Sequence, residues 1–239
     1  MEVLIVSKTH MSTMACVGGL VLTNNRYVRL LEPGNYNQEG DTDFEVGDIW
    51  DINFHNRGDL HPPHIEDVII SNKNFLRRQT NLPAFLRARN TIDWTGHIDS
   101  IFDGLLHWTH SGSGYIPEGG NLPPKSVGFW QTNRDLTRVI FDSKTRYRFP
   151  NGTNYRGLSY VGYQETTETI PAGTILRISF SRIFPPEGSS ITAPRGYYLQ
   201  LSGWYLDEHP VNTNPVPIPN TPRIFPTRPG FDVDDDLPF

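Results

Sequence analysis

Two stretches of the sequence share one pattern: Val46-Gly47-Asp48-Ile49-Trp50-Asp51-Ile52-Asn53-Phe54 and Ala172-Gly173-Thr174-Ile175-Leu176-Arg177-Ile178-Ser179-Phe180. In each, a glycine precedes an apolar run that has isoleucine at its first and fourth positions and ends in phenylalanine. This is typical of a turn followed by a strand, and a loop with Pro and Gly and one more strand follow both times. The match is short, so coincidence stays an alternative. Two small β-barrels of similar build explain both the pattern and the similar strand counts on either side.

The segments around these stretches also read mostly as strands. Abundant Pro and Gly disfavour long helices and favour short strands joined by turns. Between the two β-rich parts, residues 82–89 and 98–108 have a pattern that predicts helices, and residues 112–124 have the composition of a loop. Short apolar runs bounded by turn residues predict strands at 3–7, 16–23, 27–31, 49–54, 65–71, 127–131, 137–142, 146–149, 158–163, 175–184 and 197–205.

Charge is distributed unevenly along the 239 residues. The net charge is −5, and residues 207–239 hold six acidic residues against two basic ones, a net of −4, which leaves −1 for residues 1–206. A nearly neutral body can still carry a local basic face. The single Cys16 excludes an internal disulfide and fits a reducing compartment. The sequence contains no signal-peptide pattern and no run of membrane length, so we expect a cytoplasmic protein, with association with the nucleoid as an option.

Several short motifs resemble the bacterial dual OB domain family over residues 1–206. The resemblance implies two OB-like barrels, and genes of that family lie near DNA-processing and phage-conflict genes. The motifs that carry it are Lys8-Thr9-His10, Cys16-Val17-Gly18-Gly19, Arg29-Leu30-Leu31, Pro62-Pro63-His64-Ile65-Glu66-Asp67-Val68 and Tyr198-Leu199-Gln200-Leu201-Ser202-Gly203-Trp204-Tyr205. The fold class we predict is therefore mainly β. It comprises a first OB-like barrel (1–72), a partly helical insert (73–125), a second OB-like barrel (126–206), a disordered Pro/Asn-rich linker (207–230) and an acidic tip (231–239).

The acidic tip resembles the C-terminal tip of bacterial single-stranded DNA-binding protein, SSB. In that family an OB core is followed by a disordered linker, an acidic run, an aliphatic residue and a final Pro-Phe. A ring and a free carboxylate on one residue can enter one basic, apolar pocket, and neighbouring aspartates can meet a basic rim. A solubilising tail is the plainer alternative. The predicted partner-docking residues are Asp234, Asp235, Asp236, Leu237, Pro238 and Phe239.

Basic and aromatic residues interleave in the rest of the chain, as in a surface that stacks bases and contacts phosphates. The alternative is that the aromatic residues are barrel core and the cations are solvated. The two His pairs at 61/64 and 107/110 have no further ligands beside them, so we predict no metal site, and no motif indicates a cofactor or an enzyme. The predicted nucleic-acid-binding residues are Lys8, Arg77, Arg78, Arg87, Arg89, Trp130, Arg138, Arg146, Tyr147 and Arg148.

The sequence as a whole predicts a non-enzymatic adaptor. Its barrels would hold nucleic acid, most simply a single strand, and its tip would recruit repair or replication enzymes that bind SSB tails, such as RecQ-type helicases or exonucleases. The alternative is a module that binds a protein or a nucleotide ligand and competes with SSB for those enzymes; the nearly neutral body favours it.

Overall fold

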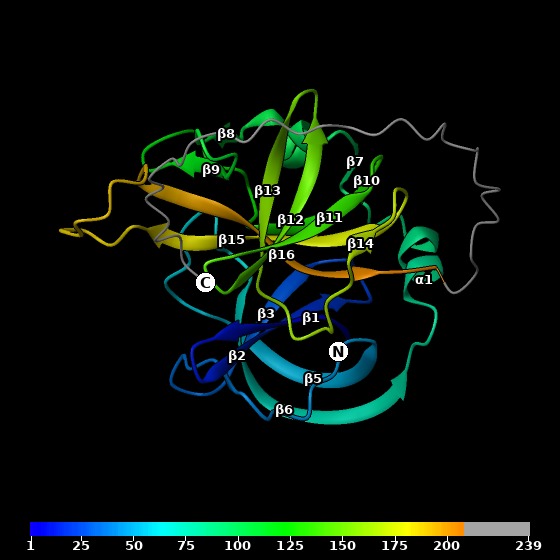
Figure 1. Cartoon of the computed structure of the whole chain (residues 1–239). Helices are drawn as coiled ribbons and strands as arrows, with labels where there is room; N and C mark the ends of the chain where they lie inside the picture. Colours follow the sequence, from blue (N-terminus) through cyan, green and yellow to red (C-terminus); the bar gives the residue numbers. More distant parts are fainter. Residues whose placement is uncertain (208–239) are drawn as a thin grey trace.

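The structure, a computed structural model, describes residues 1–207 and contains two barrels of antiparallel and parallel strands stacked on one another (Figure 1). Among these residues no helix is long and apolar enough to cross a membrane. The first barrel and its extension comprise β1 (Glu2–Met11), β2 (Met14–Val21), β3 (Tyr27–Leu31), β4 (Gln38–Glu39), β5 (Asp48–Asn56) and β6 (Asp67–Arg78). The connecting segment and the second sheet comprise α1 (Leu82–Ala88), β7 (Trp94–Gly96), the 3-10 helix η1 (Ile98–Gly104), β8 (His107–Trp108), β9 (Gly114–Pro117), β10 (Val127–Thr132), β11 (Leu136–Phe141), β12 (Lys144–Asn151), β13 (Asn154–Tyr160), β14 (Thr169–Ile170), β15 (Ile175–Phe184) and β16 (Gly196–Tyr205).

The first barrel closes through its first strand. The strands follow the order β1-β2-β3-β6-β5, and β5 returns to pair with β1. All neighbours are antiparallel except β3 and β6, which are parallel. The register of β1 against β2 shifts between Ile5 and Ser7, opposite Gly18 and Gly19. A bulge therefore bends β1 at the point where the partner strand has no side chains.

The second sheet repeats this order with its first strand divided in two. Its path β11-β12-β13-β16-β15-β10 corresponds to β1-β2-β3-β6-β5-β1, with β10 and β11 in place of the two halves of β1. The one parallel pair on this path, β13 with β16, stands where β3 pairs with β6. The prediction of two OB-like barrels is confirmed.

The two stretches that share the glycine–isoleucine pattern, 46–54 and 172–180, form equivalent strands. β5 and β15 occupy the same place in their sheets, and each is paired with the first and the last strand of its barrel. Gly47 and Gly173 have φ of +98° and +84°, a conformation that side chains other than glycine rarely adopt. The amide of Gly47 donates to the carbonyl of Ile5 at 2.9 Å, and that of Gly173 donates to Thr132 at 2.7 Å. In both barrels the glycine thus turns the chain beside the first strand.

The connecting segment differs from the sequence-based prediction in three places. β6 continues to Arg78, beyond the predicted limit of residue 72, and α1 follows with Asn81 as its N-cap. The predicted helix at 98–108 is a short 3-10 helix instead, because Ile101 is extended and Phe102 and Asp103 have positive φ. Tertiary contacts explain the break: the Phe102 ring stacks on Phe180 at 4.0 Å, and Asp103 accepts a hydrogen bond from Trp94 Nε1 at 3.1 Å. Part of the predicted loop, 112–124, forms β9.

The barrels are joined by apolar packing and by backbone contacts. A buried cluster combines Leu4 and Leu20 of the first barrel with Phe129 and Ile175 of the second. The end of β1 also pairs with the segment after β13, where the amide of His10 donates to the carbonyl of Val161 at 2.8 Å. The backbone bond and the apolar cluster together hold the first barrel against the second.

Candidate nucleic-acid interface and inter-barrel cavity

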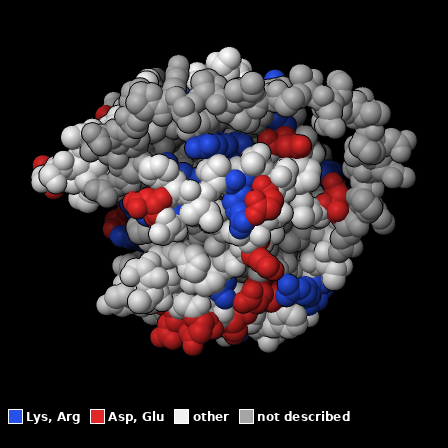
Figure 2. Space-filling view, in the orientation of Figure 1, with Lys and Arg blue, Asp and Glu red and all other residues white. Residues whose placement is uncertain are grey.

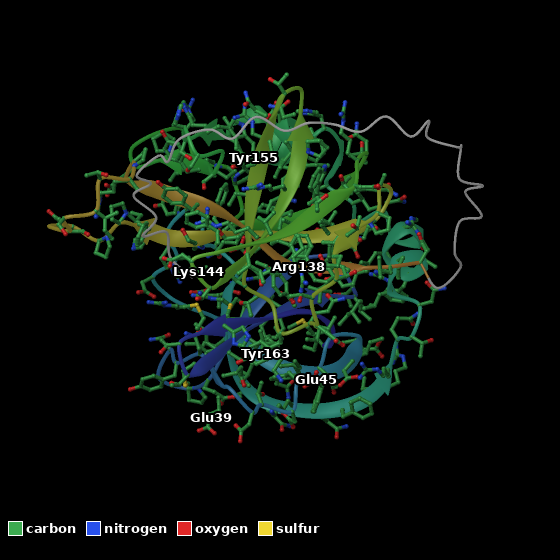
Figure 3. The ribbon with its side chains drawn as sticks, viewed as in Figure 1. Glu39, Glu45, Arg138, Lys144, Tyr155 and Tyr163 are labelled. Carbon is green, nitrogen blue, oxygen red and sulfur yellow. The ribbon has the colours of Figure 1, made fainter. Side chains whose placement is uncertain are left out.

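A row of cations follows one face of β12. Tyr147 and Phe149 of this strand are fully buried, whereas Lys144, Arg146 and Arg148 alternate with them and lie on the outer side. β11 and β13 flank the row on either side, so the three cations stand in the middle of a three-stranded face. Figure 3 labels Lys144 at one end of this strand, on the side of the second barrel that faces the viewer. The alternation of the strand therefore separates a core-forming half from a basic half.

Aromatic rings lie beside the cations. Tyr155 on β13 and Phe141 on β11 expose 41% and 38% of their surface. The guanidinium of Arg148 lies 3.9 Å from the centre of the Tyr155 ring and donates to its hydroxyl at 3.1 Å, and Arg146 lies 5.5 Å from the Phe141 ring. Accessible rings with cations nearby form the combination that binds single strands.

Both signs of charge appear on this face. Figure 2 shows Lys and Arg groups over its upper centre with Asp and Glu groups beside them, and further Asp and Glu groups gathered along the lower edge. Glu39 and Glu45, labelled in Figure 3, belong to that lower edge on the first barrel. Arg138, also labelled there, bonds to Glu168 and to the Thr166 hydroxyl at 2.8 Å, so a carboxylate offsets its charge.

A cavity of about 290 Å³ lies between the barrels. The first barrel contributes β1, β2 and β3 together with the loop before β6, and the second contributes β15 and β16. Its walls are apolar in part, and several of the polar groups that line it are themselves buried. Its polar lining includes Ser7, Arg29, His64, Glu66, Asp67, Arg177, Ser179, Arg182 and Ser202.

Asp67 is the centre of an ion-pair network at one side of this cavity. Its side chain is nearly inaccessible and accepts bonds from Arg29 at 2.5 and 2.6 Å and from Arg57 and Arg182 at 3.3 Å. Burial raises the pKa of this carboxyl, but the bonds from Arg29 and the charges of all three arginines outweigh it, so the pKa lies below its usual value. Because Arg182 comes from the second barrel, the network also ties the barrels together.

The loop before β6 makes two further contacts across the gap. His64 Nε2 lies 3.0 Å from the carbonyl oxygen of Ser181, and burial, reinforced by Arg182 and Arg29, lowers the pKa of His64 to about 3. The imidazole is therefore neutral and donates to that carbonyl. Glu66 accepts bonds from the Ser126 amide at 2.7 Å and hydroxyl at 2.8 Å. Both side chains serve to position one barrel on the other.

Comparison with known proteins agrees with the strand order. The family described as dual OB-containing domain matches residues 1–204. The chain belongs to this family. No curated protein sequence matches this dual OB chain.

Solved structures resemble the dual OB chain only distantly. The Ifi202 HINa domain in complex with a 20-bp double-stranded DNA has 12% identity and a TM-score of 0.32, over 84% of this chain and 89% of that one. A murine DNA-binding protein bound to double-stranded DNA has 11% identity and a TM-score of 0.30, over 84% and 91%. At such values the likeness says nothing of what the dual OB chain binds.

The structure corrects two of the residues predicted to bind nucleic acid. Trp130 and Tyr147 are fully buried in the core of the second barrel, where the Trp130 indole N–H donates to the Gly96 carbonyl at 3.1 Å and the Tyr147 hydroxyl donates to Thr167 at 2.8 Å. Neither ring can stack on a base. The exposed rings of Tyr155 and Phe141, which the prediction omitted, stand in their place on the outer face of the same sheet.

Five of the other predicted cations lie away from the β12 row. Lys8 is buried and bonds to Glu45 at 2.9 Å, and Arg89 bonds to Asn25 at 2.8 Å. The exposed guanidinium groups pair with carboxylates: Arg77 with Glu2 at 2.7 Å, Arg78 with Asp48 at 2.9 Å and Arg87 with Asp207 at 2.6 Å. The structure therefore brings Arg146 and Arg148 of the predicted set together with Lys144, and leaves Lys8, Arg77, Arg78, Arg87 and Arg89 on β1, β6 and the α1 segment. Residues 234–239 lie outside the described part of the chain.

The sequence did not predict the inter-barrel cavity, although one charged residue inside an apolar strand indicated an unusual environment. Arg177 interrupts the apolar strand Ile175–Phe184 in the duplicated stretch, at a position where the first copy has Asp51. A charged residue inside such a run marks either an exposed side of a strand or a buried polar site. Only the position of the other barrel decides between the two.

Proposed function

We propose that the second barrel binds single-stranded nucleic acid on the outer face of β11, β12 and β13, and that the acidic motif at residues 234–239 recruits partner enzymes to it. The observation that carries the first half is the row of Lys144, Arg146 and Arg148 between the exposed rings of Phe141 and Tyr155. β12 and β13 correspond to the second and third strands of an OB barrel, the face on which OB folds bind oligonucleotides.

Only one of the two barrels offers this face to a strand. The equivalent face of the first barrel is formed by β2 and β3, and Gly18 and Arg29 of these strands line the cavity beneath β15 and β16. The second barrel covers it, so a polynucleotide cannot follow it without separating the barrels. A single accessible face predicts a short binding site of the size that one OB fold covers, about 4–16 nucleotides.

Replacing Lys144, Arg146 and Arg148 together with glutamine is expected to weaken binding of a single strand about a hundredfold at low salt, because each cation would neutralise one phosphate. The slope of log K against log salt should fall in magnitude by about 2, at roughly 0.7 for each lost contact on a single strand. Fluorescence anisotropy with a labelled oligonucleotide, titrated at several salt concentrations, measures both quantities.

The matched control removes three cations from elsewhere: Arg77, Arg87 and Arg195 to glutamine. Each pairs with an exposed carboxylate, and the change in net charge is the same. It should leave affinity and slope close to those of the natural chain. Equal losses in both triple variants would mean that general charge rather than the β12 face attracts the strand, and no binding by the natural chain at low salt would refute the assignment.

Recruitment by the acidic motif is supported by its chemistry. Asp234–Asp236 offer charge to a basic rim, Leu237 and Phe239 offer two apolar side chains, and the proline between them lowers the conformational entropy that such a peptide loses on binding. Such a peptide suits a groove that is apolar at its base and basic at its edge. With a strand on the β12 face, the adaptor would bring an enzyme and its substrate together.

A labelled peptide of residues 231–239 is expected to bind the winged-helix domain of a RecQ-type helicase, and Phe239→Ala should reduce its affinity at least about tenfold, because the ring supplies most of the buried apolar area. Anisotropy titration measures the change. A control peptide with Asp232 replaced by asparagine keeps the Leu-Pro-Phe group and should lose much less. If Phe239→Ala binds as well as the natural peptide, the motif acts by charge alone.

The alternative of a module for a small ligand is favoured by a different observation, the cavity between the barrels. It does not compete with the strand face for space, since β12 does not line it.

A further inference from the structure

Arg177 carries a buried charge with no carboxylate beside it among residues 1–207. Its side chain is 1% exposed, and its Nε and Nη1 atoms are buried and have no hydrogen-bond partner in the described part of the chain. The guanidinium lies 4.4 Å from the centre of the Tyr27 ring and 4.9 Å from that of Phe129. Aromatic faces offset part of the cost of burying a cation, but they leave its donors unsatisfied. A native structure that retains such a group gives a reason to look for what pairs with it.

The acidic groups of the cavity are already engaged. Asp67 is shared by Arg29, Arg57 and Arg182, and Glu66 accepts from the amide and hydroxyl of Ser126. Burial raises the pKa of the Tyr27 hydroxyl, which donates to Asp93 at 2.6 Å, so this ring stays neutral beside Arg177. Among residues 1–207, three guanidinium groups therefore line the cavity against two carboxylates, and the excess positive charge belongs to Arg177.

The space beside Arg177 is kept open by small residues. A Cβ at Gly18 would lie 2.3 Å from Ser7 Oγ and 3.9 Å from Arg177 Nη2, so glycine allows the Ser7 hydroxyl to pack against β2 beside the guanidinium, and both side chains line the cavity. On the opposite wall the hydroxyls of Ser179 and Ser202 lie 2.8 Å apart. Hydroxyls that line a cavity next to a guanidinium provide further donors for an oxyanion.

We propose that the inter-barrel cavity binds a small organic molecule through its oxyanion group, phosphate or carboxylate, with Arg177 as the anchor. The guanidinium presents a planar fork that matches two oxygens of such a group. The volume of about 290 Å³ lies just below the roughly 300–1,000 Å³ typical of ligand sites, which suits a mononucleotide or a smaller acid and excludes a polymer. Val28, Val127 and Phe180 form an apolar wall for the remainder of the molecule.

This site goes beyond the proposed strand binding and occupies a different surface. Because the cavity is walled by both barrels, a bound anion would bridge β2 and β3 of one to β15 and β16 of the other. Its binding free energy would add to the stability of the pair. The first barrel, whose β2–β3 face is covered by the second barrel, would in this way help to bind a small molecule.

The test uses three probes on the full chain: inorganic phosphate, adenosine 5′-monophosphate and benzoate. They separate free phosphate, a nucleotide and a carboxylate as sources of the oxyanion. Titration calorimetry and the shift in melting temperature report binding, and the natural chain should bind at least one probe. Arg177→Met should abolish the heat and the shift while the ligand-free protein melts at the same temperature or higher, since an unpaired buried charge is replaced by an apolar chain of similar volume.

Two further variants make the result decisive. Arg177→Lys keeps the charge but loses the fork, so it should fold and bind about tenfold more weakly. Arg195→Met removes a cation that bonds to Glu118 outside the cavity and should bind as the natural chain does. The proposal is wrong if none of the three probes binds, if Arg177→Met and Arg177→Lys bind as tightly as the natural chain, or if Arg177→Met lowers the melting temperature as loss of a packing residue would.

Discussion

Replacing Asp67 with asparagine is expected to lower the free energy of unfolding by about 3–5 kcal/mol, because removing one partner of a buried ion pair leaves the other charges without compensation. Asp67 is 2% exposed, and it is the only carboxylate within bonding distance of Arg29 in the described chain. Asparagine has nearly the same shape, so the loss reports charge rather than volume. The three guanidinium groups would then repel one another across the gap between the barrels.

Urea denaturation followed by tryptophan fluorescence measures this loss. Asp59→Asn is the matched control, since Asp59 bonds to Arg57 as well but is largely exposed, and an exposed pair contributes 1 kcal/mol or less as a rough limit. If Asp67→Asn costs no more than Asp59→Asn, solvent reaches the network and the barrels are not tied together by it.

Replacing Trp130 with alanine is expected to cost about 3–5 kcal/mol of unfolding free energy, the range typical of a large aromatic side chain lost from a core. The indole is fully buried, lies 5.7 Å from Phe149 between ring centres, and loses its hydrogen bond to Gly96. Under conditions where the variant is folded, its affinity for a single strand should equal that of the natural chain, because the ring never reaches the β12 face.

Tyr155→Ala gives the opposite pattern and serves as the control. Tyr155 is exposed on β13, so its loss should change stability by only about 0.5 kcal/mol, whereas strand affinity should fall by the stacking of one base, about 1–3 kcal/mol. Denaturation and anisotropy together distinguish the two rings. A loss of affinity in the folded Trp130→Ala variant would show that the core ring contributes to binding after all.

The architecture could be predicted because its signal is local and occurs twice. Gly47 and Gly173 each require positive φ before a buried strand, and this demand is visible in the sequence whatever surrounds it. Residues 98–108 carried no such signal. Their apolar spacing fits a helix, but packing of Phe102 against Phe180, distant in the sequence, sets the backbone instead.

The candidate sites were only partly predictable. On β12 the alternation of Arg146 and Arg148 with Tyr147 shows that cations and rings lie on opposite sides, a property of any strand that sequence reasoning could have used to exclude Tyr147. The cavity, unlike the β12 face, could not be predicted from the pattern of any one strand. It arises where β2 and β3 meet β15 and β16, and neither set of residues contains information about the distance to the other.

The apolar cluster that joins Leu4, Leu20, Phe129 and Ile175 has a consequence for how the molecule can be divided. These side chains belong to both barrels, so either half produced alone would present a hydrophobic face to water and be prone to associate with other chains. The two barrels share a strand order, but they are not independent folding units. Heating should melt the two halves in one transition, and a change in either half alters the stability of both.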